Sequence, residues 1–530
     1  MAIQSAAGGR TMRLLSILLL IVPGATAAAR DPVVSLTAGR LRGSAVAHGG
    51  AVFKGIPYAQ PPAGDLRWRP PAPVKPWSGE RSATAFGPPC AQNSNGRMLE
   101  NSSEDCLFLN VWTADWPPHI SGKASRKPVM LWLHGGGNYA GTASGANFDG
   151  ESLARRGVVL VTVNYRLTVF GFFAHPELTR ESSRESGHHA SGNYGLLDQV
   201  AALQWVHHNI ERFGGDPANV TVFGQSAGAV DANVLMTSPL TKGLFQRVIA
   251  ESGTVTRNPD AATLSMTALG AVMKVKSGPV SYSDAPTLAE AESKGAAFGS
   301  VQHLRSMAAA DLLKEVAGPQ MSIGPANGIV VDGWVLPKSP AQVFASGQEH
   351  RVPLLIGNNS RERTPPPVAP EDLRHAMEAM YGPLAPKAFT LYGDRAAEWV
   401  VDTMYRCPVV AQLAWHAPGS PSFEYEFDRA APGRQALGAV HGTEVAYVFG
   451  ALNQSYADAD RAISSAMQQY WTNFAKSGNP NGPGLPQWPK FDGAARGYIE
   501  FTGEGPVAGE GLRRAYCELY VENVERLMRQ

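Results

Sequence analysis

Two short segments in the first third of the chain are apolar at almost every position. Residues 129–133 read VMLWL and residues 158–163 read VVLVTV. A strand with one face in water alternates apolar and polar residues, whereas a strand covered on both faces does not, and such strands are typical of parallel sheets. These two segments therefore predict the centre of a mostly parallel sheet with helices packed on both faces.

Other segments fit the same α/β architecture. Residues 194–210 (YGLLDQVAALQWVHHNI) have apolar residues at helical spacing, and residues 352–356 predict a further strand that ends at Gly357. Residues 260–320 and 365–415 are predicted to be helical insertions over the edge of the sheet, where segments that cover a substrate are commonly found.

The N-terminal residues predict an export signal over residues 1–29. Two arginines precede an apolar run over residues 14–22, which is too short to span a bilayer, and small residues at 25–29 offer cleavage sites. Met12 is an alternative start, and a buried or disordered segment is the alternative interpretation. No later apolar run is long enough to span a membrane, so we expect no membrane span in the mature protein. We expect the protein to be exported, either to the periplasm or outside the cell, and to form one domain over residues 30–530.

Composition narrows the class of partners. The formal net charge is +1, with 44% hydrophobic and 17% charged residues, so no charge excess points to nucleic acid. The chain has four cysteines, which in an oxidising compartment predict two disulfides with three possible connectivities. No Cys/His spacing resembles a zinc site, and the pairs His188–His189 and His207–His208 are interpreted as surface or helix residues. The sequence indicates no oligomeric state.

A G-x-S-x-G motif lies between a predicted strand and a predicted helix. Gly224 to Gly228 reads GQSAG, after an apolar strand over residues 220–223 and before a helix over residues 227–236. A nucleophile on such a turn has a strained backbone with no room for side chains at either glycine, and the helix directs its positive end at an oxyanion. Ser226 is therefore a candidate nucleophile; in a chain with 56 glycines, an ordinary serine between two glycines is the alternative.

A triple glycine supplies the candidate oxyanion hole. The sequence HGGG, from His134 to Gly137, follows the strand over residues 129–133 directly. Glycines at such a turn allow backbone N–H groups to point at a reacting carbonyl without a Cβ in the way.

A base and an acid should follow the nucleophile in the chain. His441, in GAVHGTEVAYVFG, stands out among 13 histidines because it lies late in the chain and outside any obvious helical face. Glu362 lies just beyond the predicted strand at 352–356, where active-site groups collect in such sheets. A surface salt bridge is the alternative role for Glu362, since the chain has 45 acidic residues.

Several motifs together carry a family resemblance. They are FGGDPANVTVFGQSAG (213–228), EDCLFLNVW (104–112), FKGIPYAQPPAGDLRWRPP (53–71), NYRLTVFGFF (164–173), GNYGLLDQ (192–199) and WTNFAKSGNPNG (471–482). With these motifs the chain resembles the type-B carboxylesterase and cholinesterase family of α/β hydrolases, over essentially the whole chain after the predicted signal. The resemblance implies the α/β-hydrolase fold with helical cap insertions, and hydrolysis of carboxylic esters without a cofactor or metal.

The resemblance also implies a role for each motif residue. Ser226 becomes the nucleophile, His441 the general base, and Glu362 the acid that orients it. The remaining implied features are an oxyanion hole from Gly136, Gly137 and Ala227, disulfides Cys90–Cys106 and Cys407–Cys517, salt bridges Arg67–Glu104 and Arg166–Asp198, and support of the acid by Ser252.

Departures from the family pattern bear on the substrate. Gln225 stands where the family often has a glutamate, and the Cys90–Cys106 loop contains no tryptophan, so a choline ester lacks both charge and cation–π partners. Asn138 replaces a common aromatic residue on the acyl side of the substrate site. Arg361 and Arg363 flank Glu362; they either attract a carboxylate-bearing ester or simply face solvent. Asp231 replaces a small residue, and the sequence offers no account of it.

The expected activity is thus hydrolysis of small-molecule esters that are neutral or carry a carboxylate. A lipase acting on long acyl chains is the alternative within enzymes. A non-catalytic adhesion or binding protein on the same fold is the alternative from another class, although such proteins lose a member of the triad.

Overall fold

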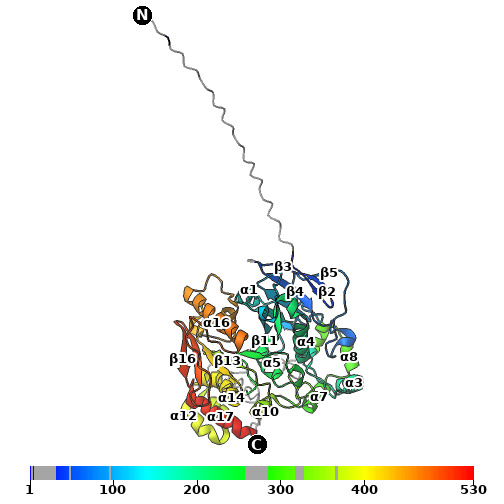
Figure 1. Ribbon diagram of the computed structural model, residues 1–530. Helices are drawn as coiled ribbons and strands as arrows, with labels where there is room; N and C mark the ends of the chain where they lie inside the picture. Colours follow the sequence, from blue (N-terminus) through cyan, green and yellow to red (C-terminus); the bar gives the residue numbers. More distant parts are fainter. Residues whose placement is uncertain are drawn as a thin grey trace.

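The computed structural model describes residues 1, 4, 31–46, 49–94, 97–256, 285–316, 328–363 and 368–529 (Figure 1). The predicted export signal lies almost entirely outside the described residues, as do parts of both predicted insertions. None of the helices in the described part of the chain combines the length and the apolar character that a membrane span requires.

An 11-stranded sheet forms the centre of the molecule, in the order β16-β15-β14-β13-β12-β11-β9-β10-β8-β4-β3. Its strands are β3 (Ser44–Ala45), β4 (Ala51–Pro57), β8 (Phe108–Thr113), β9 (Lys127–Leu133), β10 (Val159–Val163), β11 (Gly215–Gln225), β12 (Arg247–Glu251), β13 (Leu354–Asn359), β14 (Ser422–Phe427), β15 (Gly497–Thr502) and β16 (Gly505–Glu510). The strands from β10 to β15 pair in parallel, and the strands at both edges pair antiparallel. This confirms the predicted mostly parallel sheet.

Helices cover both faces of this sheet (Figure 1). They are α1 (Glu151–Arg155), α2 (Thr168–Gly171), α3 (Pro176–Ser186), α4 (Tyr194–Asn209), α5 (Ala227–Leu235), α7 (Leu288–Ala296), α8 (Val301–Ser306), α9 (Ala309–Val316), α10 (Pro340–Ala345), α11 (Pro370–Tyr381), α12 (Ala385–Tyr392), α13 (Ala396–Val401), α14 (Cys407–His416), α15 (Val445–Phe449), α16 (Asp458–Ser477) and α17 (Arg514–Met528). Small additional sheets are formed by β1 (Val33–Leu36), β2 (Gly39–Arg42) and β5 (Glu80–Ser82), and by β6 (Asn93–Ser94) and β7 (Arg97–Met98).

Strand β9 shows why both faces are apolar. Val129, Leu131 and Leu133 belong to the core that includes α4 and α5, whereas Met130 and Trp132 belong to the core that includes α16. In Figure 1, α16 and α4 lie on opposite sides of β11, next to β9. Since side chains alternate along a strand, only a run without polar residues can serve two cores.

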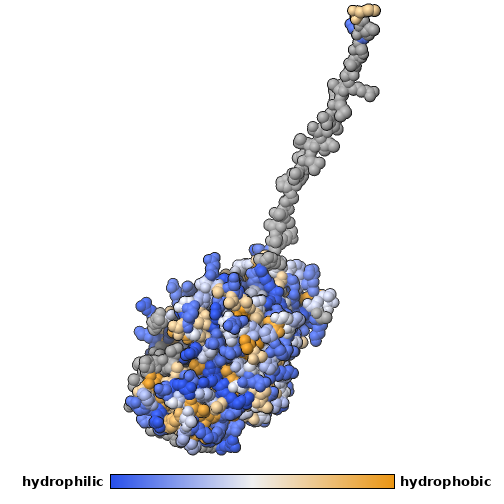
Figure 2. Space-filling view, turned by 90° about the vertical axis from the view of Figure 1, so that its left-hand side faces the viewer, coloured by the Kyte–Doolittle hydropathy of each residue, from blue (hydrophilic) through white to orange (hydrophobic). Residues whose placement is uncertain are grey.

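The surface differs from this interior. Figure 2 shows hydrophilic side chains over most of one face, with smaller hydrophobic groups scattered among them. Scattered apolar groups of this kind are ordinary on a folded protein and mark no site by themselves.

The prediction for the strand near residue 352 was wrong at both ends. Strand β13 runs from Leu354 to Asn359 and passes through Gly357 rather than ending there. A Cβ at Gly357 would lie 2.2 Å from the carbonyl oxygen of Tyr425 on the neighbouring strand β14. The glycine therefore allows close approach of two strands and does not terminate one.

Covalent and ionic links hold distant segments together as the resemblance implied. Cys90 is bonded to Cys106, and Cys407 on α14 is bonded to Cys517 on α17. The two ion pairs that the resemblance implied are also present: Arg67–Glu104, at 2.6 Å, and the fully buried Arg166–Asp198, at 2.7 Å.

Candidate active site

Ser226 occupies a tight turn between β11 and α5. Its backbone has φ 55° and ψ −122°, outside the regions that most residues prefer. A Cβ at Gly228 would lie 2.0 Å from the carbonyl oxygen of Leu133, and one at Gly224 would lie 2.6 Å from the carbonyl carbon of Gly228. Both glycines of the motif are therefore required by close packing, as the sequence predicts.

Hydrogen bonds hold this turn in its strained shape. The N–H of Ser226 donates to the carbonyl oxygen of Glu251 on β12, at 2.8 Å. The carbonyl oxygen of Ser226 accepts from Ala229 and Val230, which closes the first turn of α5. The first N–H groups of a helix have no partners within it, so α5 presents donors and a positive dipole end at Ser226.

The glycine-rich loop after β9 lies against Ser226. A Cβ at Gly135 would lie 3.1 Å from the Cβ of Ser226. The next residues have positive φ values: 114° at Gly136, 67° at Gly137 and 61° at Asn138. This run of left-handed residues turns the backbone sharply beside the serine, which is the shape that a backbone oxyanion hole requires.

Glu362 and His441 form a hydrogen-bonded pair. The Nδ1 of His441 lies 2.5 Å from Oε2 of Glu362. The carboxylate of Glu362 is buried and also accepts from Ser252 Oγ, at 2.5 Å, and from the N–H of Asn359, at 2.8 Å. A buried carboxylate with several donors is held in one orientation, and it holds the imidazole in turn.

The charges around His441 favour its protonated form. Burial opposes that form, but the charge and hydrogen bond of Glu362 outweigh burial and raise the pKa of His441 above its usual 6.5. A second buried carboxyl, Glu444, also stabilises the imidazolium. Burial raises the pKa of Glu444 itself to about 7.

The structure places Gln225 beside the same imidazole. Its Nε2 lies 3.3 Å from Nε2 of His441. In the neutral imidazole that donates a hydrogen bond from Nδ1 to Glu362, Nε2 is an acceptor, and the amide of Gln225 is assigned as the donor to it. The sequence indicated that Gln225 changes the charge next to the serine but gave no sign of this contact.

The two arginines that flank Glu362 have different surroundings. Arg363 donates from Nε to the hydroxyl of Tyr405, at 3.0 Å, and the ring of Tyr405 lies 5.4 Å from that of His441. The Tyr405 hydroxyl, with smaller contributions from Tyr139 and Glu362, raises the pKa of Arg363 despite partial burial. The side chain of Arg361 packs instead against Gly438, and both arginines are exposed.

The sequence did not explain why Asp231 replaces the small residue that is usual at this position of the family. Asp231 is fully buried in α5 and accepts hydrogen bonds from Asn138, in the glycine-rich loop, and from Gln199, in α4. The sequence signal that could have found it is a charged residue inside an otherwise small and apolar helix.

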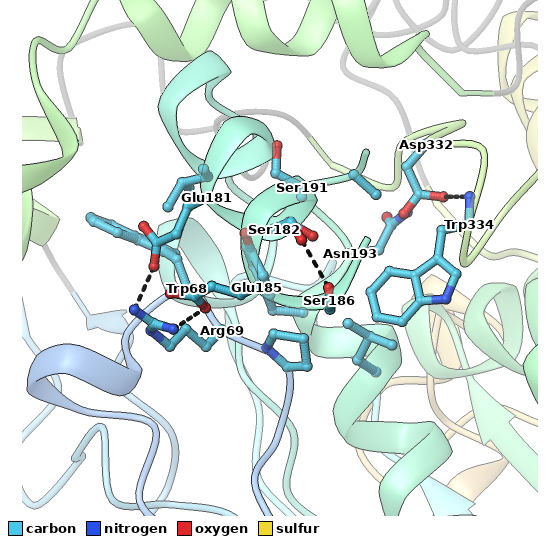
Figure 3. A pocket seen from close by; sticks show the side chains of 16 residues that line it. Trp68, Arg69, Glu181, Ser182, Glu185, Ser186, Ser191, Asn193, Asp332 and Trp334 are labelled. Atoms are coloured by element: carbon cyan, nitrogen blue, oxygen red, sulfur yellow. Dashed lines mark hydrogen bonds and ion pairs between the residues drawn. The ribbon is translucent and has the colours of Figure 1, made fainter. Parts of the chain in front are cut away.

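A cavity between α3 and the start of α4 lies apart from this site (Figure 3). Its lining includes Trp68, Trp334 and Asp332 but none of the residues described above. Glu181 in its wall is paired with Arg69, and Asp332 accepts hydrogen bonds from the backbone N–H of Trp334 and from Asn193. These carboxylates are already satisfied by protein groups. Among the described residues, no cluster of His, Cys, Asp and Glu side chains could hold a metal ion.

A serine on a strained strand–helix turn, beside a glycine-rich loop and a paired glutamate and histidine, defines an α/β hydrolase. The sequence matches the profile of the carboxylesterase family over residues 30–366 and 363–520. It is 34% identical to carboxylesterase 1D of Rattus norvegicus over 571 aligned residues, which cover 95% of each chain. It is also 34% identical to fumonisin B1 esterase of Sphingopyxis macrogoltabida, covering 87% of this chain and 84% of that protein.

A solved structure of PNB esterase superposes on this chain with a TM-score of 0.73 and is 33% identical to it in sequence. The superposition covers 92% of this chain and 100% of the PNB esterase chain. The chain belongs to the carboxylesterase family. It is a serine carboxylesterase that hydrolyses carboxylic esters.

Proposed function

We propose that ester hydrolysis proceeds through an acyl-enzyme made by the triad Ser226, His441 and Glu362. The Glu362–His441 hydrogen bond carries this proposal, because it fixes the tautomer in which Nε2 of His441 is a base. That nitrogen lies 3.3 Å from the amide of Gln225, the residue before Ser226, so the base is at the turn that holds the serine.

The chemical steps follow from these positions. The Oγ of Ser226 attacks the ester carbonyl while His441 takes its proton, and the protonated His441 then gives the proton to the leaving alcohol. The N–H groups of Gly136, Gly137 and Ala227 hold the tetrahedral oxygen. Water activated by His441 completes the cycle, and loss of one oxyanion donor is expected to cost about 10²–10³ in rate.

The substrates are small esters that are uncharged or carry a carboxylate, rather than choline esters. The amide of Gln225 provides no negative charge for a cation, and no tryptophan lies between Cys90 and Cys106 to bind one. Arg363 adds a positive charge near His441 through its hydrogen bond to Tyr405. The side chain of Asn138 is hydrogen-bonded to Asp231 and is smaller than an aromatic ring, so it leaves more room on the acyl side of the substrate site.

We also propose that the enzyme is exported, to the periplasm or outside the cell. Two disulfides support this, because such bonds persist in oxidising compartments. The catalytic domain spans residues 30–530, and the helices α7 to α9 and α11 to α14 belong to its cap insertions.

Replacement of the nucleophile tests the triad. Ser226→Ala is expected to reduce kcat for p-nitrophenyl butyrate by at least 10⁴-fold, since the acyl-enzyme cannot form. A burst of nitrophenol in rapid-mixing experiments should be present in the parent enzyme and absent from the variant. Ser252→Ala, which retains the nucleophile and removes one hydrogen bond to Glu362, serves as a comparison. Full activity of Ser226→Ala would exclude the proposed mechanism.

A further inference from the structure

The buried aspartate of α5 connects three elements around the glycine-rich loop. Oδ1 of Asp231 accepts from Nδ2 of Asn138, at 3.0 Å, and its Oδ2 accepts from Nε2 of Gln199, at 2.6 Å. Asp231 and Gln199 are 0% exposed and Asn138 is 6% exposed, so water does not compete for these bonds. α5 begins at the residue after Ser226, so the same helix that shapes the nucleophile turn also holds this carboxylate.

Asn138 is in turn part of the backbone that shapes the loop. It follows Gly136 and Gly137 directly and has φ 61°, a left-handed conformation that is uncommon for residues other than glycine. Its carbonyl oxygen accepts from the N–H of Thr168, at 2.8 Å, and its side-chain oxygen accepts from the hydroxyl of Tyr165, at 3.3 Å. Hydrogen bonds thus fix both the backbone and the side chain of Asn138, and Asp231 accepts the one that the side-chain NH₂ donates.

Loss of the carboxylate would leave this arrangement incomplete. The amide hydrogens of Asn138 and Gln199 that point at Asp231 would become buried donors without acceptors, which is destabilising. The strained conformation at Asn138 then loses one of the contacts that maintain it. The loop can relax by turning its backbone, and the N–H groups of Gly136 and Gly137 turn with it.

We propose that Asp231 is a positioning residue for the oxyanion hole: through Asn138 it fixes the backbone of Gly136 and Gly137 in the shape that binds the tetrahedral oxygen. This rests on the proposed function, because it presupposes that these two N–H groups form the hole. Asp231 touches no substrate and acts only through Asn138.

The surroundings also supply a conservative variant. Burial raises the pKa of Asp231 to about 7, so the site accommodates a neutral group. The Oε1 of Gln199 is buried and has no hydrogen-bond partner among the described residues. In Asp231→Asn, the side-chain oxygen can still accept from Asn138, while its new NH₂ can donate to Gln199 once that amide turns over.

Kinetics on four variants test the proposal: Asp231→Ala, Asp231→Asn, Asn138→Ala and the double variant Asp231→Ala/Asn138→Ala. With p-nitrophenyl butyrate, Asp231→Ala should lose about 10- to 100-fold in kcat with less than threefold change in KM, because only the transition state uses the hole. Asp231→Asn should recover most of that loss. The double variant should be no slower than Asn138→Ala, because the carboxylate acts through that amide.

Inhibition by a trifluoromethyl ketone separates this role from a merely structural one. Its adduct with serine carries an oxyanion, so Asp231→Ala should weaken its binding at least tenfold while KM for the ester hardly changes. Asp332→Asn is the matched control, since Asp332 is also buried, also bonded to an asparagine and also raised in pKa, but lies in the separate cavity. It should leave kcat and inhibitor binding within twofold of the parent values.

Three results would overturn the proposal. The first is a folded Asp231→Ala variant with parental kcat, and the second is a double variant in which the two losses in kcat add. The third is parental activity of Asn138→Ala, and this result can be obtained even if Asp231→Ala does not fold. Failure of the proposed function would look different, because the parent enzyme would then lack activity that depends on Ser226.

Discussion

Four residues at or next to this site share an unusual backbone. Ser226, Ser252, Asn138 and Thr168 all have positive φ values between 55° and 61°. Ser226 carries the hydroxyl of the proposed nucleophile, Ser252 donates to Glu362, and Thr168 donates to the carbonyl of Asn138. Strained residues persist only where the surrounding fold imposes them, and they cluster at functional sites. Here the strained backbone occurs at the proposed nucleophile, at the serine bonded to Glu362 and at the end of the glycine-rich loop.

Arg363 gives a prediction for the substrate class. Arg363→Gln should lower kcat/KM for mono-p-nitrophenyl adipate about fivefold to tenfold, because the carboxylate of that ester loses its cation. The rate for p-nitrophenyl hexanoate, which has a methyl group in place of the carboxylate, should stay within twofold. Arg361→Gln is the matched control and should affect neither ester. Equal losses for both esters would show that Arg363 supports the fold near His441 rather than the substrate.

These residues show which features of the site could be predicted from the sequence and which could not. The turn at Ser226, the glycine loop and the pairing of Glu362 with His441 could be predicted because each lies in a local pattern or a family motif, and the structure brings Glu362 and His441 together. The catalytic roles of these residues stay predictions. The contact of Gln225 with His441 and the bond of Asp231 to Asn138 could not, because they join segments far apart in the chain. A single sequence carries no information on which amide faces which carboxylate.

Between elements, the decisive contact is that of α5 with β9. A Cβ at Gly228, on the first turn of α5, would lie 2.0 Å from the carbonyl oxygen of Leu133 at the end of β9. The helix can approach the strand so closely only because no side chain intervenes. This contact keeps the start of α5 next to the glycine-rich loop that follows β9.

Gly228→Ala should therefore push α5 away from β9. We expect destabilisation by about 1–3 kcal/mol, as for other overpacked sites, and a loss of at least 100-fold in kcat because Ser226 moves relative to the loop. Thermal unfolding and esterase kinetics measure the two effects. Gly493→Ala is the matched control, since a Cβ there has open space around it. An active Gly228→Ala enzyme would mean that the turn adapts without cost.

The boundaries of elements were less predictable than their existence. The strands at 129–133 and 158–163 and the helix at 194–210 were all predicted, and the structure has them as β9, β10 and α4. The end of β13 was wrong because glycine was interpreted as a terminator. Whether a glycine ends a strand or admits a neighbour depends on that neighbour, here Tyr425 on β14.

At the scale of the whole molecule, several carboxyl groups are buried in the central sheet and in α5. Burial raises the pKa of Glu424 to about 8 and that of Asp231 to about 7, and it raises the pKa of Glu251 as well. Neither oxygen of Glu424 has a hydrogen-bond partner among the described residues. A carboxyl group in such surroundings is more stable with its proton than without it.

The effect of these groups on stability has a definite sign. In the unfolded chain Glu424 and Asp231 lose their protons near pH 4, whereas in the folded protein Glu424 keeps its proton to about pH 8 and Asp231 to about pH 7. Between those values the folded state binds more protons, so the free energy of unfolding falls as pH rises. His441 acts in the same direction, because its raised pKa contributes stability at low pH that is lost as pH rises through that pKa.

Glu424→Gln tests this account, because the variant cannot ionise. The difference in Tm between the variant and the parent should increase as pH rises from 5 to 8.5, by about 3 °C or more, since only the parent then pays the cost of a buried charge or a retained proton. Thermal unfolding at fixed ionic strength, followed by circular dichroism, gives both Tm values. Any effect of the amide itself on Tm is the same at every pH and therefore leaves the trend with pH unchanged. The control is Glu504→Gln, on the exposed turn between β15 and β16, which should show no such trend. If the Tm difference for Glu424→Gln does not change with pH, Glu424 is ionised in the folded protein and this account is wrong.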